Sequence, residues 1–481
     1  MRLSELIAGA QVEAVSGDPE VEISALAYDS RRAAPGTLYF CVPGRDSDGH
    51  DFAPAAVEAG SPALVIERDL ELAATQVRVA DARAAMAPLA ARFWDDPTAE
   101  LQMAGITGTN GKTTTAFLLR GILEAAGRYC GLLGTVMQVV GGTEEEVVRT
   151  TPEAIDLQAT FRRMLDAGDD ACVMEVSSHA LTLHRADSIH FDVAVFTNLS
   201  QDHLDFHADM EDYFAAKRLL FEAGPGAAVV NLDDPFGQRL AAEIDCLTFS
   251  AAGAGADFRA VDVGFDAAGA RFRVEGQSGS VEVEMPLPGE FNVANALAAL
   301  TAAAALGVDP ATSAGALAGA ARVPGRFEPV DEGQPFTVLV DYAHTPEALE
   351  NVLRAARPLT DGRLISVFGA GGDRDREKRP RMGRIGAELS DLAIVTSDNP
   401  RSEGPDAIIE DIVAGVARAG NGVEVEPDRR TAIGLAFRQA AAGDMVVIAG
   451  KGHEQGQEFE GGRKIPFDDR EIAREELRKL S

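Results

Sequence analysis

A glycine-rich segment that carries a lysine and several threonines is the clearest chemical signal in the 481-residue chain: Gly108-Thr-Asn-Gly-Lys-Thr-Thr114. Gly108 and Gly111 allow backbone N–H groups to turn toward phosphate oxygens. Lys112 is long enough to reach the outer phosphates of a nucleoside triphosphate, and the Thr113 hydroxyl suits Mg²⁺. Only two residues separate the glycines, fewer than in the common nucleotide loop. The segment predicts a phosphate-binding loop, and alone it does not distinguish a kinase, a motor and a ligase.

The residues on either side of this loop supply the elements that must position it. The apolar run 101–106 predicts a strand, and residues 113–126 have a helical pattern. A strand that enters a glycine-rich turn and leaves as a helix places phosphate at the helix N-terminus, where the backbone dipole favours an anion. An incidental strand-to-helix turn with a chance lysine is the alternative, and this context argues against it.

Apolar runs that predict strands alternate with helical patterns along most of the chain, which indicates a mostly parallel sheet wound with helices. Residues 257–287 differ, because three short alternating segments there predict an antiparallel insert. A chain of this length exceeds one hydrophobic core. We predict three α/β domains: a small N-terminal domain (residues 1–87), a central phosphate-loop domain with a mostly parallel sheet and the insert (88–326), and a C-terminal Rossmann-like domain (327–481).

Composition narrows the class of protein. The formal net charge of −32 argues against nonspecific binding to nucleic acid or to anionic membranes. The N-terminus has no long apolar region, and the Ala-rich stretch 293–308 predicts a helix of a soluble protein, so neither a signal peptide nor a membrane span is expected. The four cysteines lack metal-ligand spacing and are expected to be reduced thiols. A cytoplasmic monomer is the expectation.

Further motifs follow the loop in a fixed order, and together they resemble the Mur ligases, cytoplasmic bacterial enzymes that build the peptidoglycan stem peptide. The resemblance covers essentially the whole chain. The quoted motifs are Thr107-Gly-Thr-Asn-Gly-Lys-Thr113, Met174-Glu-Val-Ser-Ser-His179, Thr197-Asn-Leu-Ser-Gln-Asp-His203, Ala215-Ala-Lys217, Gly325-Arg-Phe-Glu328, Asp341-Tyr-Ala-His344 and Gly450-Lys-Gly-His-Glu454.

The resemblance implies an ATP-dependent amide-bond ligase that works through an acyl phosphate. It implies two Mg²⁺ ions, for which a strand-end carboxylate such as Glu175 is a suitable hard ligand. It also implies a carbamylated Lys217, a modification that the residues alone do not reveal. The expected catalytic set is Lys112, Glu175, His203 and Lys217, and the expected metal ligands are Thr113, Glu175, His203 and the Lys217 carbamate.

The resemblance also assigns residues to ATP and to a UDP-N-acetylmuramoyl dipeptide, which the N-terminal domain is expected to bind. The expected ATP contacts are Gly108, Thr109, Asn110, Gly111, Lys112, Thr113, Thr114, Asn292, Asn295, Arg326, Asp341 and His344. The expected dipeptide-substrate contacts are Tyr28, Ser30, Arg45, Asp46, Ser47, Thr150, Thr151, Ser177 and Arg185. Simple helix capping is the alternative for Asn292. Arg149 and Leu183 depart from the Asn and Gln that the family often has there.

The turn Asp398-Asn-Pro-Arg401 narrows the resemblance to members that add meso-diaminopimelate. Diaminopimelate differs from lysine by a far carboxylate, and the planar fork of an arginine pairs with a carboxylate through two hydrogen bonds. The C-terminal domain is therefore expected to bind the amino acid. The expected contacts are Arg374, Asp398, Asn399, Pro400, Arg401, Gly450 and Glu454.

Two other readings remain open on the sequence alone. Within the ligases, a lysine-adding enzyme or a folylpolyglutamate synthase is possible in principle; Arg401 argues against the first and the segment Tyr28–Arg31 against the second. From another class, a phosphate-loop ATPase or kinase would turn over ATP without an amino acid. That reading leaves the 398–401 and 450–454 motifs without a role.

Overall fold

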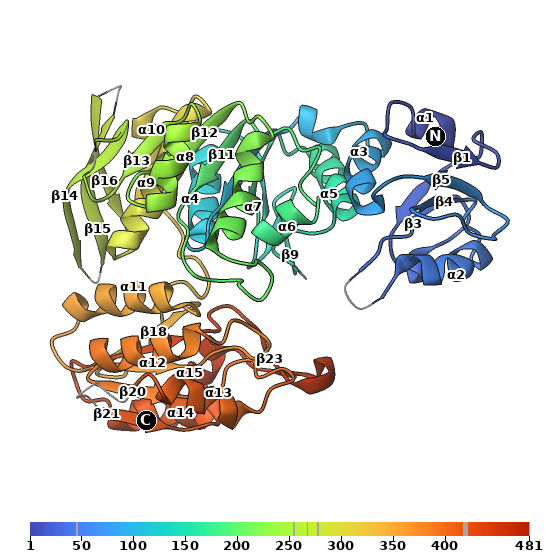
Figure 1. Ribbon diagram of the computed structural model, residues 1–481. Helices are drawn as coiled ribbons and strands as arrows, with labels where there is room; N and C mark the ends of the chain where they lie inside the picture. The colour runs from blue at the N-terminus through green and yellow to red at the C-terminus, as the bar shows by residue number, and fades with distance from the viewer. Residues whose placement is uncertain are drawn as a thin grey trace. The chain divides into compact units, whose positions relative to one another are not determined.

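The computed structural model of the protein describes residues 1–44, 47–147, 149–253, 255–266, 268–276, 279–416 and 422–480 (Figure 1). The chain forms two compact units. The first comprises Met1–Gly105, Arg128–Ala194 and Leu219–Gly226, and the second comprises Ile106–Gly127, Val195–Arg218 and Ala227–Ser481. Among the described helices, none has the length and apolar composition needed to cross a membrane.

The N-terminal part of the first unit is built on a five-stranded sheet in the order β1-β5-β4-β3-β2, in which only the β1–β5 pair is antiparallel. Alternate residues of the central strands pack into two separate cores: Leu38 and Phe40 on one face, Tyr39 and Cys41 on the other. The elements are α1 (Leu3–Leu6), β1 (Ala14–Ser16), β2 (Ala25–Ala27), η1 (Ser30–Arg32), β3 (Thr37–Phe40), η2 (Gly49–Phe52), α2 (Ala53–Glu58), β4 (Ala63–Ile66), β5 (Thr75–Arg78) and α3 (Ala82–Phe93).

The middle of the chain contributes an eleven-stranded sheet in the order β16-β15-β14-β13-β12-β11-β6-β10-β7-β8-β9. The short helix η3 (Pro97–Ala99) precedes the first of these strands. The strands are β6 (Gln102–Thr107), β7 (Cys130–Leu133), β8 (Gln138–Val140), β9 (Thr143–Glu145), β10 (Ala171–Glu175), β11 (Val193–Phe196), β12 (Ala227–Asn231), β13 (Leu247–Ser250), β14 (Phe258–Asp266), β15 (Gly269–Gly276) and β16 (Gly279–Met285). Its helices are α4 (Lys112–Ala125), α5 (Ala154–Ala167), α6 (Ser178–Thr182), α7 (Met210–Glu222), α8 (Pro235–Glu243), α9 (Glu290–Ala305) and α10 (Pro310–Ala318).

The predicted antiparallel insert is confirmed. β14 pairs with β15 and β15 with β16, both antiparallel, whereas β12–β13, β13–β14 and β7–β10 are parallel pairs. The three strands lie side by side in yellow-green in Figure 1. Cross-strand ion pairs such as Arg271–Glu284 at 3.0 Å cover the exposed face of these strands, a modest contribution for exposed charges.

The C-terminal part is a six-stranded sheet in the order β17-β18-β22-β19-β20-β21, parallel except for the β17–β18 pair. Alternate strand residues pack against α11–α13 on one face and α14–α15 on the other, which explains the unbroken apolar runs of these strands. The elements are β17 (Glu328–Pro329), β18 (Thr337–Asp341), α11 (Pro346–Ala356), η4 (Arg357–Leu359), β19 (Leu364–Phe368), α12 (Lys378–Leu389), β20 (Leu392–Val395), α13 (Pro405–Val413), β21 (Gly422–Val425), α14 (Arg429–Gln439), β22 (Met445–Ala449), β23 (Gly456–Glu458), η5 (Glu460–Gly462), β24 (Lys464–Pro466) and α15 (Asp469–Arg478).

These sheets confirm the three-part α/β prediction, while the boundaries at 87/88 and 326/327 stay a prediction. The parallel strands of the C-terminal sheet end at residues 341, 368, 395 and 449, directly before the segments that carry the predicted amino-acid contacts. Ligands of open α/β sheets bind outside these carboxyl ends. The fold therefore places those segments at one edge of one sheet.

Candidate functional site

The glycine-rich loop connects the end of β6 to the start of α4, whose N-cap is Gly111. Gly111 has a φ of +85°, and a Cβ at this position would lie 2.3 Å from the Oδ1 of Asn295. A Cβ on Gly108 would lie 1.9 Å from the hydroxyl of Thr197. Both glycines are therefore required by backbone conformation and by close approach of neighbouring side chains.

The loop is braced by the segment that follows β11. The backbone N–H of Asn110 donates to Asn198 Oδ1 at 2.9 Å, and the Thr109 hydroxyl accepts from the N–H of Ser200 at 3.0 Å. The Lys112 ammonium donates to the carbonyls of Gly108 and Thr109, each at 2.8 Å. Lys112 thus bends over the loop itself, where its charge can stabilise phosphate oxygens held by the loop.

Lys217 is buried, although a lysine among alanines and leucines on a helix is usually solvated. Only 1% of the residue is exposed. Its Nζ donates to the carbonyl of Gly108 at 2.8 Å and lies 4.6 Å from the ring centroid of Tyr213. Burial, reinforced by the nearby charge of Lys112, lowers the pKa of the Lys217 ammonium well below its ordinary value. The neutral amine that this favours is the form that can react with CO₂.

The carboxylate of Asp202 lies close to three basic side chains, of which only His203 adjoins it in the sequence. Its carboxylate lies 3.5 Å from His203 Nε2, 3.6 Å from His344 Nε2 and 3.5 Å from the buried Lys378 ammonium. Burial alone would raise the pKa of Asp202, but Lys378 and the two histidines hold it well below its usual range. Asp202 therefore joins His203, a predicted metal ligand, to His344, a predicted ATP contact.

Two of the predicted ATP contacts outside the loop are Arg326 and Asp341. Arg326 donates to the Thr113 hydroxyl at 3.1 Å and stacks over the Tyr342 ring at 4.2 Å, so a guanidinium stands at the start of α4. Asp341 is buried and accepts the backbone N–H groups of residues 327 and 343, at 2.7 and 2.8 Å. Burial raises the pKa of Asp341. The Asp341 carboxylate therefore holds the backbone at residues 327 and 343 in place.

The two asparagines of α9 are buried, and the capping alternative for Asn292 is wrong. The N-cap of α9 is Gly289, and Asn292 is the third residue of the helix. Its side chain donates to the carbonyl of Pro288 at 2.9 Å and accepts from Asn295 at 3.3 Å. Asn295 in turn lies 3.5 Å from the Thr115 hydroxyl in α4. The pair connects α9 to the loop helix, and its adenine contact stays a prediction.

In the first unit, Glu175 stands at the end of β10 and is 1% exposed. Its carboxylate accepts the N–H and the hydroxyl of Thr135 at 2.7 and 3.0 Å. That hydroxyl lies 3.1 Å from the hydroxyl of Thr150, while Thr151 donates to the Glu175 carbonyl at 3.0 Å and accepts from the N–H of Ser177 at 3.2 Å. The structure thus brings four predicted site residues, Glu175, Thr150, Thr151 and Ser177, into one hydrogen-bonded cluster.

Beside this cluster, one buried carboxylate faces three guanidinium groups. Glu153 lies 2.9 Å from Arg185, 2.7 Å from Arg149 and 3.0 Å from Arg83. Burial lowers the pKa of Arg185, and the neighbouring arginines add to the effect. The excess of positive charge suits an anionic substrate group. Arg185 was predicted; Arg83 carries no motif by which the sequence could single it out.

The predicted contacts to the uridine end of the substrate are only partly described. The Tyr28 hydroxyl donates to Asp156 at 2.6 Å, which ties the N-terminal sheet to α5. Ser30 begins η1, and the carbonyl of Ser47 accepts the N–H of Gly44 at 2.9 Å. Arg45 and Asp46 lie outside the described residues. The roles assigned to these positions stay predictions.

The predicted amino-acid contacts at 398–401 and 450–454 meet around Lys451, which is not among the residues predicted to bind the amino acid. The buried Lys451 ammonium donates to Asn399 Oδ1 at 2.9 Å and to Glu454 at 2.7 Å. Asn399 also donates to Glu454 at 2.9 Å. Burial raises the pKa of Asp398, but Lys451 and Arg429 bring it below its ordinary value. A Cβ on Gly450 would come within 2.5 Å of the Asp398 carboxylate.

The two predicted arginines lie on neighbouring loops of this edge. Arg401 has a φ of +52°, and its guanidinium donates to the carbonyl of Gly372 at 2.7 Å and to Glu458 at 3.0 Å. The carbonyl of Pro400 lies so close to Gly372 that a Cβ there would approach it to 1.9 Å. Arg374 donates to the carbonyl of residue 373 at 2.9 Å. The loops after β19 and β20 therefore hold each other and present both cations.

The donor chemistry of the predicted metal ligands suits Mg²⁺ under one condition. Among the described residues, no cluster of three or more His, Cys, Asp or Glu side chains could hold a metal ion. The predicted set contains two such side chains, Glu175 and His203, and otherwise a hydroxyl and Lys217. An ammonium at Lys217 would repel a cation, whereas a carbamate would offer hard oxygen donors. Taken one by one, the Thr113 hydroxyl, the Glu175 carboxylate and a Lys217 carbamate would be oxygen donors of the kind Mg²⁺ prefers.

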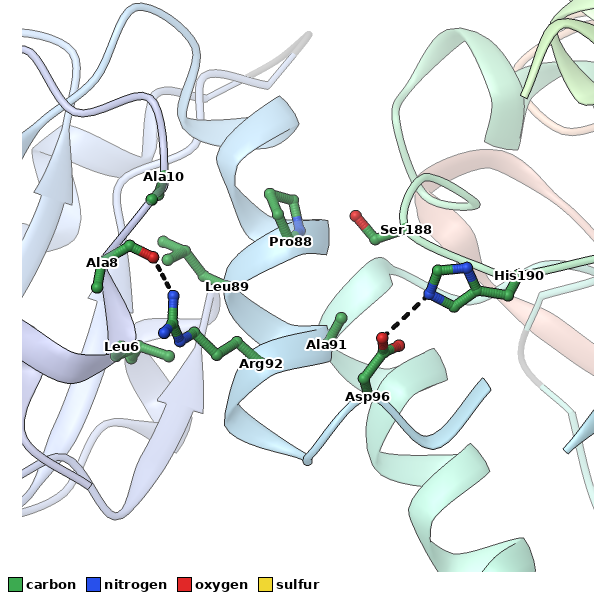
Figure 2. A pocket seen from close by; sticks show the side chains of 11 residues that line it. Leu6, Ala8, Ala10, Pro88, Leu89, Ala91, Arg92, Asp96, Ser188 and His190 are labelled. Atoms are coloured by element: carbon green, nitrogen blue, oxygen red, sulfur yellow. Dashed lines mark hydrogen bonds and ion pairs between the residues drawn. The ribbon is translucent and has the colours of Figure 1, made fainter. Parts of the chain in front are cut away.

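The first unit contains a pocket of about 410 Å³ (Figure 2). None of the residues that line it is a predicted site residue. Small and apolar side chains form most of its wall. Arg92 donates to the carbonyl of Ala8, and His190 pairs with Asp96 at 3.0 Å, so its polar groups are paired with each other. The lining residues are Leu6, Ala8, Gly9, Ala10, Pro88, Leu89, Ala91, Arg92, Asp96, Ser188 and His190.

Three family models match successive parts of the chain. The Mur ligase family catalytic domain matches residues 22–94, the Mur ligase middle domain residues 106–303, and the Mur ligase glutamate ligase domain residues 325–452. Together they span most of the sequence, and their order is that of the three sheets.

Relatives of known name match over nearly the whole length. UDP-N-acetylmuramoyl-L-alanyl-D-glutamate–2,6-diaminopimelate ligase of Gloeobacter violaceus is 48% identical, with 100% of this chain and 98% of that protein covered. The protein of the same name from Syntrophomonas wolfei is 46% identical, with 99% of each covered. A solved structure of a ligase of this name matches at 33% identity and a TM-score of 0.70, covering 100% of this chain and 99% of the other. The chain belongs to the Mur ligase family.

Proposed function

We propose that the protein joins meso-diaminopimelate to the D-glutamate of UDP-N-acetylmuramoyl-L-alanyl-D-glutamate, with ATP converted to ADP and phosphate. The relatives named for this reaction, at 46–48% identity over 98–99% of their lengths, support the assignment. The observation that supports this function most strongly is that one chain has both a phosphate loop and a turn at 398–401. This turn presents Arg401 and lies beside Glu454. This is the cytoplasmic stage of peptidoglycan synthesis, and we place the protein in a bacterial cytoplasm.

The first step activates a carboxylate. An oxygen of the substrate carboxylate attacks the γ-phosphorus of ATP, the bond to the β–γ bridging oxygen breaks, and ADP leaves with that electron pair. Loop N–H groups, Lys112 and Arg326 stabilise the charge on the phosphates, and this positioning supplies most of the catalysis in such transfers. Mg²⁺, when bound, neutralises charge on the phosphate oxygens and lowers the repulsion between the two anionic reactants.

The second step forms the amide. The neutral amine of the amino acid attacks the acyl carbon of the acyl phosphate, a tetrahedral intermediate forms, and phosphate leaves as the amide carbonyl is restored; the amine loses one proton. Water would hydrolyse the acyl phosphate, so the loops around it must exclude water. Asp202 and Lys378 connect the segment after β11 to α12, and this contact can keep the loops together during the reaction.

Lys217 is assigned the role of a carbamylated metal ligand. Its burial and lowered pKa support the assignment, because a neutral amine is required for reaction with CO₂. The N–H that remains on a carbamate nitrogen can still donate to the Gly108 carbonyl. The modification would thus replace a buried amine by an anion whose charge Mg²⁺ could compensate.

The far end of diaminopimelate carries both an ammonium and a carboxylate. Arg401 is suited to the carboxylate, and the oxygen atoms of Asp398 and Glu454 to the ammonium, with Arg374 available for the other carboxylate. Lysine would leave Arg401 without its partner, which is costly where the guanidinium is partly desolvated.

The test uses purified protein with Mg-ATP and UDP-N-acetylmuramoyl-L-alanyl-D-glutamate, and follows phosphate release before and after addition of meso-diaminopimelate or lysine. Release should depend on diaminopimelate, and Arg401→Ala should raise KM for diaminopimelate while leaving KM for ATP unchanged. Phosphate release that is the same without an amino acid would favour a phosphate-loop ATPase instead. Equal use of lysine would favour a lysine-adding ligase.

A further inference from the structure

A short strand outside the predicted motifs holds the 398–401 turn in place. The side chain of Gln457 donates to the carbonyl of Asp398 at 2.6 Å, and the N–H of Glu458 donates to Asn399 Oδ1 at 3.0 Å. The N–H of Arg401 donates to the carbonyl of Glu458 at 3.1 Å. β23 therefore contacts three of the four residues of the turn through hydrogen bonds.

The same strand also engages the side chain that is expected to recognise the amino acid. The Nε of Arg401 donates to Glu458 Oε2 at 3.0 Å, and Nη1 donates to the Gly372 carbonyl at 2.7 Å. A guanidinium has five N–H bonds in one plane. Among the described residues none accepts from Nη2, so both N–H bonds of Nη2 and one of Nη1 remain for a ligand. The two contacts fix which edge of the guanidinium faces outward.

We propose that Glu458 is a positioning residue for the amino-acid site, one that orients the Arg401 guanidinium so that its Nη edge meets the far carboxylate of the incoming diamino acid. The inference rests on the proposed function, because it concerns the same substrate. Glu458 does not itself touch the substrate.

The backbone of Arg401 explains why such a partner is needed. Its φ of +52° is rare for a residue with a side chain, so the turn sets the direction in which the side chain leaves the backbone. From there the long arginine side chain has many rotamers, and fixing them on binding costs free energy. A carboxylate that already holds Nε removes most of that cost before the substrate arrives. Carboxylate recognition by two parallel hydrogen bonds is sensitive to this alignment.

Glu454, the group expected to receive the ammonium, is held in the same manner by an opposite charge. Lys451 and Asn399 contact it at 2.7 and 2.9 Å. The two receptor groups, Arg401 and Glu454, thus each carry a counter-charge from the protein. The far end of diaminopimelate carries an ammonium and a carboxylate and adds no net charge to these two ion pairs, whereas the far end of lysine adds one positive charge. Because Arg401 is expected to meet the far carboxylate, which lysine lacks, losing the contact that orients Arg401 should weaken discrimination between diaminopimelate and lysine.

The test compares Glu458→Ala with Glu458→Gln, since the amide oxygen of Gln can still accept from Nε while the charge is lost. Glu458→Ala should raise KM for meso-diaminopimelate about five- to tenfold, with kcat and KM for ATP within about twofold of wild type. The ratio of kcat/KM for diaminopimelate to that for lysine should fall by a similar factor. Glu458→Gln should recover most of both values. Glu458 is 43% exposed at its side chain, so neither variant removes part of the core.

Glu460→Ala is the matched control, because this glutamate is exposed two residues further along the chain. It should match wild type in every constant. An unchanged KM for diaminopimelate in Glu458→Ala, or equal shifts in the Ala and Gln variants, would overturn the positioning role. Those results are distinct from a failure of the proposed function, which would appear as phosphate release by the wild-type protein that ignores diaminopimelate.

Discussion

A buried ion pair behind the amino-acid site allows a stability prediction with a definite size. Arg429 donates from Nε and Nη2 to the two carboxylate oxygens of Asp469 at 2.8 and 2.6 Å, and neither side chain is exposed. Nη2 also donates to the carbonyl of Ala449, directly before Gly450. The substitution Arg429→Met keeps the length of the side chain and removes its charge. Asp469 is then left as a buried carboxylate without its cation.

The expected loss follows from the cost of an uncompensated buried charge. Removing one partner of a buried pair typically costs about 3–5 kcal/mol. For a domain of about 150 residues, each kcal/mol of lost stability lowers the melting temperature by roughly 2–4 °C. Arg429→Met should therefore lower the melting temperature of the C-terminal part by roughly 6–20 °C. The double variant Arg429→Met/Asp469→Leu removes both charges and should recover most of the loss, because an apolar pair of similar volume carries no desolvation cost.

Thermal unfolding followed by circular dichroism on the full chain measures these differences. Arg354→Ala is the control, since it breaks the exposed Arg354–Glu350 pair and should cost less than about 0.5 kcal/mol. A melting temperature of Arg429→Met within about 2 °C of wild type would refute the reasoning. So would a double variant no more stable than the single one, because the loss would then not come from the orphaned Asp469.

Three further predictions concern the loop, the buried lysine and the effect of acid. Lys217→Ala should lower activity at least about a hundredfold, with partial rescue by a small carboxylate in the phosphate-release assay; full activity without rescue would contradict the carbamate role. Gly111→Ala should weaken ADP binding about five- to thirtyfold by calorimetry, because φ is +85° and the new Cβ meets Asn295 at 2.3 Å; unchanged affinity would show that the loop relaxes. Arg379 lowers the pKa of Glu403 from 4.5 to about 2, so this stabilisation is present above pH 4.5 and lost as the pH falls toward 2. Acid unfolding of Glu403→Gln should therefore depend less on pH than that of wild type, and parallel curves would argue against the pair.

Much of the architecture was accessible from the sequence because parallel strands buried on both faces are continuous apolar runs. β22 (Met445–Ala449) is apolar and buried along its whole length, and the predicted strand 101–106 differs from β6 by one residue at each end. The positions of the motifs directly after these strands also follow from topology, since carboxyl ends of parallel strands share an edge. The phosphate loop was predicted in this way, whereas the roles of Arg401 and Glu454 were predicted from the resemblance to the Mur ligases.

The residues that the sequence did not reveal share a different property: each acts through a charge pair between segments far apart in the chain. Asp202 meets Lys378, Glu153 meets Arg83, and Arg401 meets Glu458, over separations that no local pattern records. A lysine in a helix or a glutamate beside a turn has the same sequence appearance whether it is solvated or buried against a partner. The motif residues determine which chemistry is possible, while these partners determine the pKa and the orientation with which the motif residues perform it.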